Sequence, residues 1–140
     1  MSKVFIFGCG YLGMRLADAL IAGGYEVGAL TKNETFAKAL KARGITEVIV
    51  DRLESDSWHS LVGNDYTKII NCVSSAGNGL SGYESSYYEG QASIYNGLNR
   101  IPLKRLFIRV VLRYILKIRG AGSVKILLRK TAFILIRLRF

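Results

Sequence analysis

Short, uninterrupted apolar runs alternate along the first hundred residues with longer stretches whose apolar positions recur every three or four residues. The first run, residues 4–7, is β-branched or aromatic throughout, as in a strand buried on both faces of a parallel sheet. Further strands are predicted at residues 25–30, 47–50 and 67–73, and helices at 11–24, 34–43, 55–61 and 82–98. Ser55 is the expected N-cap of the short helix. This alternation predicts an α/β fold with a doubly wound parallel sheet.

Three glycines follow the first strand at the spacing G-x-G-x-x-G, namely Gly8, Gly10 and Gly13. We expect Gly8 to permit a tight turn, Gly10 to leave room for a pyrophosphate and Gly13 to let the next helix approach the strand. The free N–H groups at the start of that helix would face the same anion. No Lys-Ser/Thr pair follows, which disfavours a nucleoside-triphosphate loop. The motif predicts a dinucleotide site that also includes Cys9, Tyr11 and Leu12.

The end of the second predicted strand indicates which dinucleotide is preferred. An NAD site usually has an Asp or Glu there for the ribose 2′-hydroxyl, whereas an NADP site uses a basic side chain. Here the sequence is Thr31-Lys32-Asn33, without a carboxylate. We therefore expect Lys32 to hold a 2′-phosphate, which favours NADP over NAD. A solvated loop lysine is the ordinary alternative.

Charge divides the 140 residues into two parts. Residues 1–99 carry eight Lys or Arg against all ten acidic residues, a net charge of −2, whereas residues 100–140 carry twelve Lys or Arg and no acid. The net charge of +10 therefore comes from the tail and does not describe the predicted domain.

Candidate reactive side chains are few. Cys9 and Cys72 are the two cysteines, and no signal-peptide pattern precedes the first strand, so we expect a reduced, cytoplasmic setting. Cys9 is expected to fill the tight turn and not to act as a reactive thiol. His59, the single histidine, has no partner at ligand spacing, so no metal site is predicted. The tyrosines of the last helix are expected to pack and not to catalyse; they are Tyr83, Tyr87, Tyr88 and Tyr95.

Residues 3–98 resemble the extended and atypical short-chain dehydrogenase/reductase superfamily, in particular its NAD(P)-dependent epimerase/dehydratase group. The matching segments are residues 4–13, 29–32, 51–53, 71–75 and 88–92. The resemblance implies an NAD(P)-binding Rossmann-like sheet, here truncated after the fourth strand and following helix. It also implies that Asp51 contacts the adenine amino group, Leu53 contacts the adenine ring, and residues 73–75 contact the nicotinamide-side ribose. The implied cofactor residues are thus Asp51, Arg52, Leu53, Val73, Ser74 and Ser75.

The family's catalytic groups are a later Ser or Thr and a Tyr-x-x-x-Lys pair, in which the Lys lowers the tyrosine pKa for proton exchange with a substrate hydroxyl. Tyr114 and Lys117 are three positions apart instead of four, so no catalytic residue is assigned. We expect an inactive, dinucleotide-binding fragment of an oxidoreductase whose full-length relatives act on a small-molecule substrate, such as a nucleotide sugar. A non-catalytic NADP-sensing protein is the alternative.

Residues 100–140 have two interpretations. The first is a basic amphipathic segment for an anionic membrane surface or nucleic acid, because Arg105, Arg109, Arg113 and Lys117 recur every four residues. Apolar residues surround this stripe broadly, so we expect at most weak membrane contact, no specific nucleic acid and no transmembrane segment. The second is an out-of-frame translation that begins near residues 98–100. One permitted set of codons for residues 107–116 reads Tyr-Thr-Ser-Ser-Thr-Ser-Val-Tyr-Pro in the adjacent frame, which resembles the family's strand-five serine motif. We favour the second interpretation, in which the tail is not part of the native fold.

Sequencing the coding DNA tests the out-of-frame interpretation. We expect the adjacent frame to encode Ser-Ser-Thr-Ser and, further on, a Tyr-x-x-x-Lys. An adjacent frame that lacks both motifs would contradict the interpretation.

Overall fold

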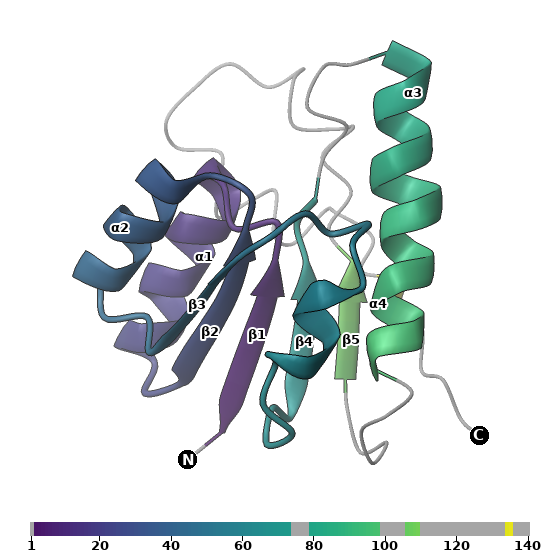
Figure 1. Ribbon diagram of the computed structural model, residues 1–140. Helices are drawn as coiled ribbons and strands as arrows, with labels where there is room; N and C mark the ends of the chain where they lie inside the picture. Colours follow the sequence, from purple (N-terminus) through teal and green to yellow (C-terminus); the bar gives the residue numbers. More distant parts are fainter. Residues whose placement is uncertain (1, 74–78, 99–105, 110–133, 136–140) are drawn as a thin grey trace.

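The computed structural model describes residues 2–73, 79–98, 106–109 and 134–135 (Figure 1). Strands β1 (Lys3–Phe7), β2 (Glu26–Thr31), β3 (Glu47–Val50) and β4 (Lys68–Asn71) pair in parallel in the order β3-β2-β1-β4. They confirm the four predicted strands, although β4 ends two residues earlier than predicted. The strand order reverses direction at β1, as in a doubly wound sheet.

The sheet continues past the four predicted strands. Strand β5 (Leu106–Arg109) pairs in parallel with β4, and β6 (Ile134–Leu135) pairs antiparallel with β5. Both strands come from the apolar and basic tail, whose β-branched and leucine residues suit a strand. Strand β5 covers the edge of β4, which would otherwise expose unpaired N–H and C=O groups.

Helices cover both faces of the sheet (Figure 1). On one face, α1 (Tyr11–Ala22) and α2 (Glu34–Ala42) enclose a core that includes Val4 and Ile6. On the other face, the 3-10 helix η1 (Ser57–Ser60) and α4 (Gly90–Leu98) enclose a second core around Phe5 and Phe7. Alternate residues of a strand face opposite sides, so the uninterrupted apolar sequence of β1 supplies both cores.

The predicted helices are present, with two corrections. The short helix begins at Ser57 with Asp56 as its N-cap, so the predicted Ser55 cap is wrong; the Ser55 hydroxyl oxygen still accepts a hydrogen bond from the Ser57 N–H, at 3.2 Å. The last helix begins three residues earlier than predicted, with α3 (Gly79–Tyr83), and passes through a π-helical turn, η2 (Glu84–Glu89), before α4. Such turns often occur at functional sites and leave no simple periodicity signal.

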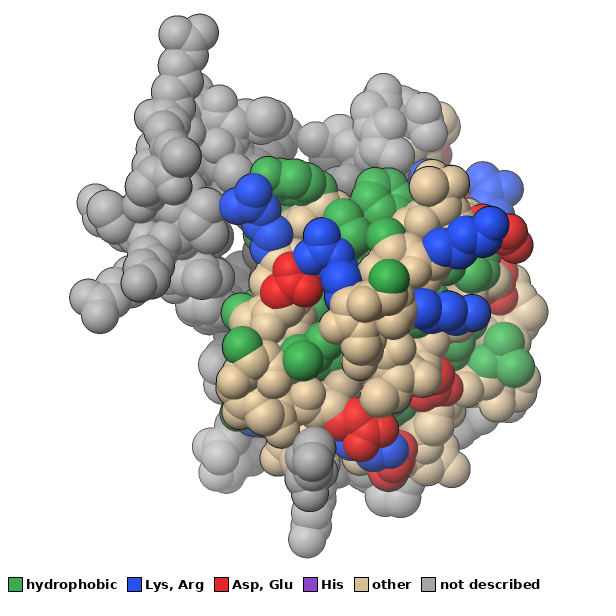
Figure 2. Space-filling model, turned by 90° about the vertical axis from the view of Figure 1, so that its left-hand side faces the viewer, with side chains coloured by type: hydrophobic (Ala, Val, Ile, Leu, Met, Phe, Trp, Pro, Cys, Tyr) green, Lys and Arg blue, Asp and Glu red, His purple; other side chains and the backbone are tan. Residues whose placement is uncertain are grey.

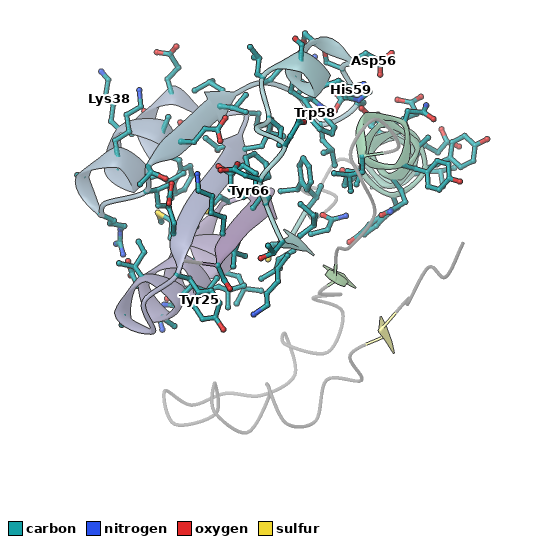
Figure 3. All side chains as sticks on the ribbon, turned by 90° about the horizontal axis from the view of Figure 1, so that it is seen from below. Tyr25, Lys38, Asp56, Trp58, His59 and Tyr66 are labelled. Carbon is teal, nitrogen blue, oxygen red and sulfur yellow. The ribbon has the colours of Figure 1, made fainter. Side chains whose placement is uncertain are left out.

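Small residues let α4 approach η1 closely. Gly90, Ser93 and Gly97 lie on the buried side of α4, and a Cβ atom on Gly97 would be 2.7 Å from ring atoms of both Trp58 and His59. We call the continuous stretch of α3, η2 and α4 the long helix. In Figure 3 the rings of Trp58 and His59 lie between the sheet and the long helix. The opposite side of the helix faces solvent.

The expected packing of the helix tyrosines is wrong for two of them. Tyr88 is 78% exposed and Tyr95 is 45% exposed. Both lie on the solvent side of the long helix, where the sheet cannot reach them.

The surface over α1 and α2 carries many Lys and Arg side chains (Figure 2). Among them, Arg43 forms an ion pair with Asp18, whereas Lys38 points outward (Figure 3). None of the helices in the described part of the chain has the length and apolar character needed to cross a bilayer.

Replacing Gly97 by alanine tests the close packing of α4 on η1. Alanine normally stabilises a helix relative to glycine, but here its methyl group would collide with the rings of Trp58 and His59. We expect Gly97→Ala to lower the free energy of unfolding by about 1–3 kcal/mol in urea denaturation. Asn96→Ala, at an exposed neighbouring position, is the control. Equal or higher stability of Gly97→Ala would contradict the packing.

Candidate functional site

A cleft of about 600 Å³ lies at the carboxyl ends of the parallel strands. Its walls are the turn after β1, the segments that follow β2 and β3, the end of β4, and one side of α3 and η2. Since β2 and β3 lie on one side of β1 and β4 on the other, the cleft is at the point where the strand order reverses. Open α/β sheets usually bind ligands at this point.

Gly8 lines the cleft and lies against Val73, which follows β4. Its φ of +69° is a left-handed conformation that favours glycine. A Cβ atom there would also be 2.7 Å from the backbone N and Cα of Val73. The turn therefore requires glycine for its conformation and for its close contact with the neighbouring strand.

Gly10 differs from Gly8, because a Cβ atom at Gly10 would meet no protein atom within 4 Å. Its φ of −95° lies outside the left-handed region, so φ does not require glycine here, and no protein atom limits the space for a side chain. Gly10 lines the cleft and is the N-cap of α1. The missing side chain leaves empty space where a ligand would reach the backbone.

The first turn of α1 presents N–H groups to this space. The Met14 N–H donates to the Gly10 carbonyl at 2.9 Å, which closes the first helical turn. No side chain caps the helix, and the described residues offer no acceptor to the N–H groups of Tyr11, Leu12 and Gly13. These amides and the positive end of the helix dipole favour an anion.

Gly13 brings α1 close to the turn. A Cβ atom on this buried residue would be 3.1 Å from the Cys9 sulfur and 3.3 Å from the Gly8 carbonyl oxygen. Tyr11 lies at the rim of the cleft, 69% exposed, where its hydroxyl accepts a hydrogen bond from Arg15 Nη2 at 2.6 Å. The tight turn at Gly8 and the close approach at Gly13 agree with the roles predicted for these two glycines, and the pyrophosphate role of Gly10 stays a prediction.

The segment after β2 combines a structural cap with a free lysine. Asn33 Oδ1 accepts hydrogen bonds from the N–H groups of Thr35 (2.8 Å) and Phe36 (3.3 Å), which begins α2. Lys32 lines the cleft, is exposed, and has no ion-pair partner among the described residues. Thus the predicted residue Lys32 is in place for a ligand, whereas Asn33 is used by the fold.

The segment after β3 holds the next three predicted residues. One carboxylate oxygen of Asp51 accepts the Arg52 N–H at 2.7 Å and the other accepts the Ser57 hydroxyl. Arg52 Nε is 3.1 Å from Glu54 Oε1. Leu53 is 6% exposed, and its carbonyl accepts a hydrogen bond from Trp58 Nε1 at 2.9 Å. All three residues line the cleft, but Leu53 presents only a small part of its side chain to it.

Asn71 arranges the end of β4. This buried side chain accepts a hydrogen bond from the Val73 N–H at 3.0 Å and donates to Gln91 Oε1 at 3.3 Å. The amide thereby ties the turn after β4 to α4. Val73 lines the cleft as predicted; Ser74 and Ser75 lie outside the described residues.

Sequence reasoning missed the wall formed by the long helix. Its cleft-lining residues are Ser81, Gly82, Ser85 and Ser86. Ser81 and Gly82 are followed four positions later by Ser85 and Ser86, and this spacing is the sequence signal that places all four on one side of a helix. The π-helical turn has no such signal, although it alters which side of the helix the following residues occupy.

His59 serves the packing of η1 on α4 and does not line the cleft. Its Nε2 is 2.9 Å from the Ser93 hydroxyl oxygen, and that hydroxyl donates to the Ser55 carbonyl at 3.0 Å. Asp56 Oδ1 is near the same ring nitrogen, at 3.6 Å. These contacts join η1 to α4, so they give His59 a structural role. The described residues contain no cluster of three or more metal-ligating side chains.

Both cysteines are buried next to the glycine turn. Burial raises the pKa of the Cys9 thiol from 9.0 to about 12, with a further contribution from Asp18. Burial likewise raises the pKa of Cys72 to about 12, and the nearby Cys9 adds to it. Thiolates are the reactive species, so the expectation that Cys9 fills space is supported over the reactive alternative.

The buried thiols should resist alkylation in the folded protein. A pKa near 12 leaves on the order of a thousandfold less thiolate at pH 8 than the ordinary pKa of 9.0. We expect iodoacetamide to modify both cysteines in urea and neither in native buffer. The same shift lowers the free energy of unfolding as the pH rises from about 9 towards 12, because only the unfolded chain releases these protons. Rapid labelling of either thiol in the native chain would contradict this.

No family model matches the chain, and no curated protein matches its sequence. Several solved structures share its fold. A Bacillus halodurans protein described as an NAD-dependent epimerase/dehydratase is 22% identical, with a TM-score of 0.67 over 78% of this chain and 50% of that one. The Bordetella bronchiseptica enzyme WbmF, solved with NAD+ and UDP, is 15% identical, with a TM-score of 0.56 over 71% of this chain and 32% of that one. An engineered reductase is 14% identical, with a TM-score of 0.59 over 78% of this chain and 37% of that one.

These identities are low, so the likeness is one of fold. The chain spans half the length of the first structure and about a third of the other two. Two of the matched structures are described as an epimerase/dehydratase and a reductase, the kinds of protein that residues 3–98 resemble in sequence. The chain therefore has the Rossmann-like α/β fold of these three structures.

Proposed function

We propose that the cleft binds a nicotinamide dinucleotide, with its pyrophosphate against Gly10 and the first turn of α1. The observation that supports this proposal most strongly is the empty space at Gly10, where neither φ nor protein packing requires glycine. A ligand that contacts the backbone explains the missing side chain. The unpartnered N–H groups beside it supply an anion site without a charged side chain.

The remaining cleft residues fit the other parts of such a cofactor. Lys32 would contact the adenine-side ribose, Asp51 and Leu53 would contact the adenine, and Arg52 would bind the cofactor beside them. Val73, with Ser74 and Ser75 beyond it, would face the nicotinamide-side ribose. The basic side chain and missing carboxylate at the end of β2 support NADP over NAD.

The proposed role is that of the cofactor half of an epimerase, dehydratase or reductase of the cytoplasm. A nicotinamide cofactor supplies hydride transfer when bound; the residues of this chain bind and orient it. The sequence lacks the Tyr-x-x-x-Lys pair, so we propose binding without turnover for this chain, and a nucleotide sugar or similar substrate for full-length relatives. The same missing pair supports a second candidate, a non-catalytic NADP sensor. In this proposal residues 100–140 are an out-of-frame tail that is no part of the native fold, and β5 is drawn onto the open edge of β4 because its sequence is apolar.

Titration of the full chain with NADPH and NADH tests the proposed binding. We expect the nicotinamide fluorescence to change with a saturable dependence on protein concentration. Gly10→Val should weaken binding of both cofactors at least about tenfold, because its side chain would fill the space beside the α1 amides.

Gly23→Val is the matched control, at an exposed position at the other end of α1. Both variants should keep the wild-type circular dichroism spectrum, since a Cβ atom at Gly10 meets no protein atom. Undiminished binding by Gly10→Val, or no binding by the wild type, would overturn the proposal.

A further inference from the structure

Four charged side chains line one end of the cleft, and their formal charges cancel. Lys32 follows β2, whereas Asp51, Arg52 and Glu54 follow β3. The register places Thr31 opposite Val50, so the two segments leave neighbouring strands at the same level. The absence of an acid after β2, read from the sequence, is therefore offset by two acids from the next strand.

These four charges are not equally available to a ligand. Both oxygens of Asp51 accept hydrogen bonds within the loop, from the Arg52 N–H and the Ser57 hydroxyl. Arg52 is held to Glu54 through Nε alone, at 3.1 Å, and the two side chains are 75% and 30% exposed. An exposed ion pair of this kind is weak. The ion pair can therefore break, which leaves Arg52 and Glu54 free to contact a ligand in the cleft.

We infer that the Arg52–Glu54 pair determines how strongly the cleft distinguishes a ribose 2′-phosphate from a 2′-hydroxyl, an inference that rests on the proposed dinucleotide function. The terminal nitrogens of Arg52, together with Lys32, are donors for a phosphate, to which a guanidinium binds through parallel hydrogen bonds. Glu54 is an acceptor for a hydroxyl and repels a phosphate. Its charge therefore limits the NADP preference that Lys32 alone would give.

Charge-neutral substitutions at the two positions separate these effects. In titrations of the full chain with NADPH and NADH, we expect Glu54→Gln to shift the ratio of the two Kd values about threefold to tenfold towards NADPH. Arg52→Gln should shift the ratio about tenfold towards NADH. Both shifts should diminish at high salt, since the groups are exposed.

Two control variants make the same charge changes elsewhere. Glu89→Gln lies on the exposed π-helical turn and Lys38→Gln on the outer side of α2, and neither residue lines the cleft. Both controls should leave the ratio within about twofold of wild type. Adenosine 2′,5′-bisphosphate and AMP serve as further probes, because they report on the ribose end without the nicotinamide.

The outcomes separate this inference from the proposed function. If the wild type binds both dinucleotides and neither cleft variant changes their ratio more than its control does, the inference is wrong and the proposed function stands. If the wild type binds neither dinucleotide, the proposed function is wrong and the inference falls with it. Opposite shifts in the two cleft variants support both.

Discussion

The close contact between the backbones of Gly8 and Val73 is the constraint on which the cleft depends. The turn after β1 is left-handed at Gly8, and the contact leaves no room for a side chain between the turn and the segment after β4. This turn directs the first N–H groups of α1 into the cleft, which lies where the strand order reverses. Strand pairing brings the ends of β1 and β4 together, but this contact decides that they share one cavity.

A second constraint acts from the other face of the sheet. The segment after β3 is held by Trp58, which donates to the Leu53 carbonyl, and by the close packing of η1 on Gly97. This packing belongs to the core and lies away from the cleft, yet it fixes where Asp51 and Arg52 emerge. The position of the charged end of the cleft thus depends on glycine and serine residues of α4.

The charged end of the cleft shows why a motif rule needs the neighbouring strand. The rule for cofactor preference considers the end of β2, where Lys32 is the relevant charge. In the folded chain, Arg52 and Glu54 from the segment after β3 face the same cavity. The charges of Lys32, Asp51, Arg52 and Glu54 together set the electrostatic potential at a ribose bound in this end of the cleft.

The sequence was enough to predict the four strands, their parallel sheet, the glycine turn and most of the residues that line the cleft, because alternation of apolar runs and glycine spacing are local properties of the chain. Tertiary structure decided the rest. The π-helical turn, the wall of small residues in the long helix and the solvent exposure of Tyr88 and Tyr95 depend on what packs against that helix. The position of Arg52 and Glu54 beside Lys32 and the burial of both thiols depend on which strands are neighbours. These features depend on contacts between segments that are distant in the sequence, and among them only the small residues of the long helix leave a signal in local spacing.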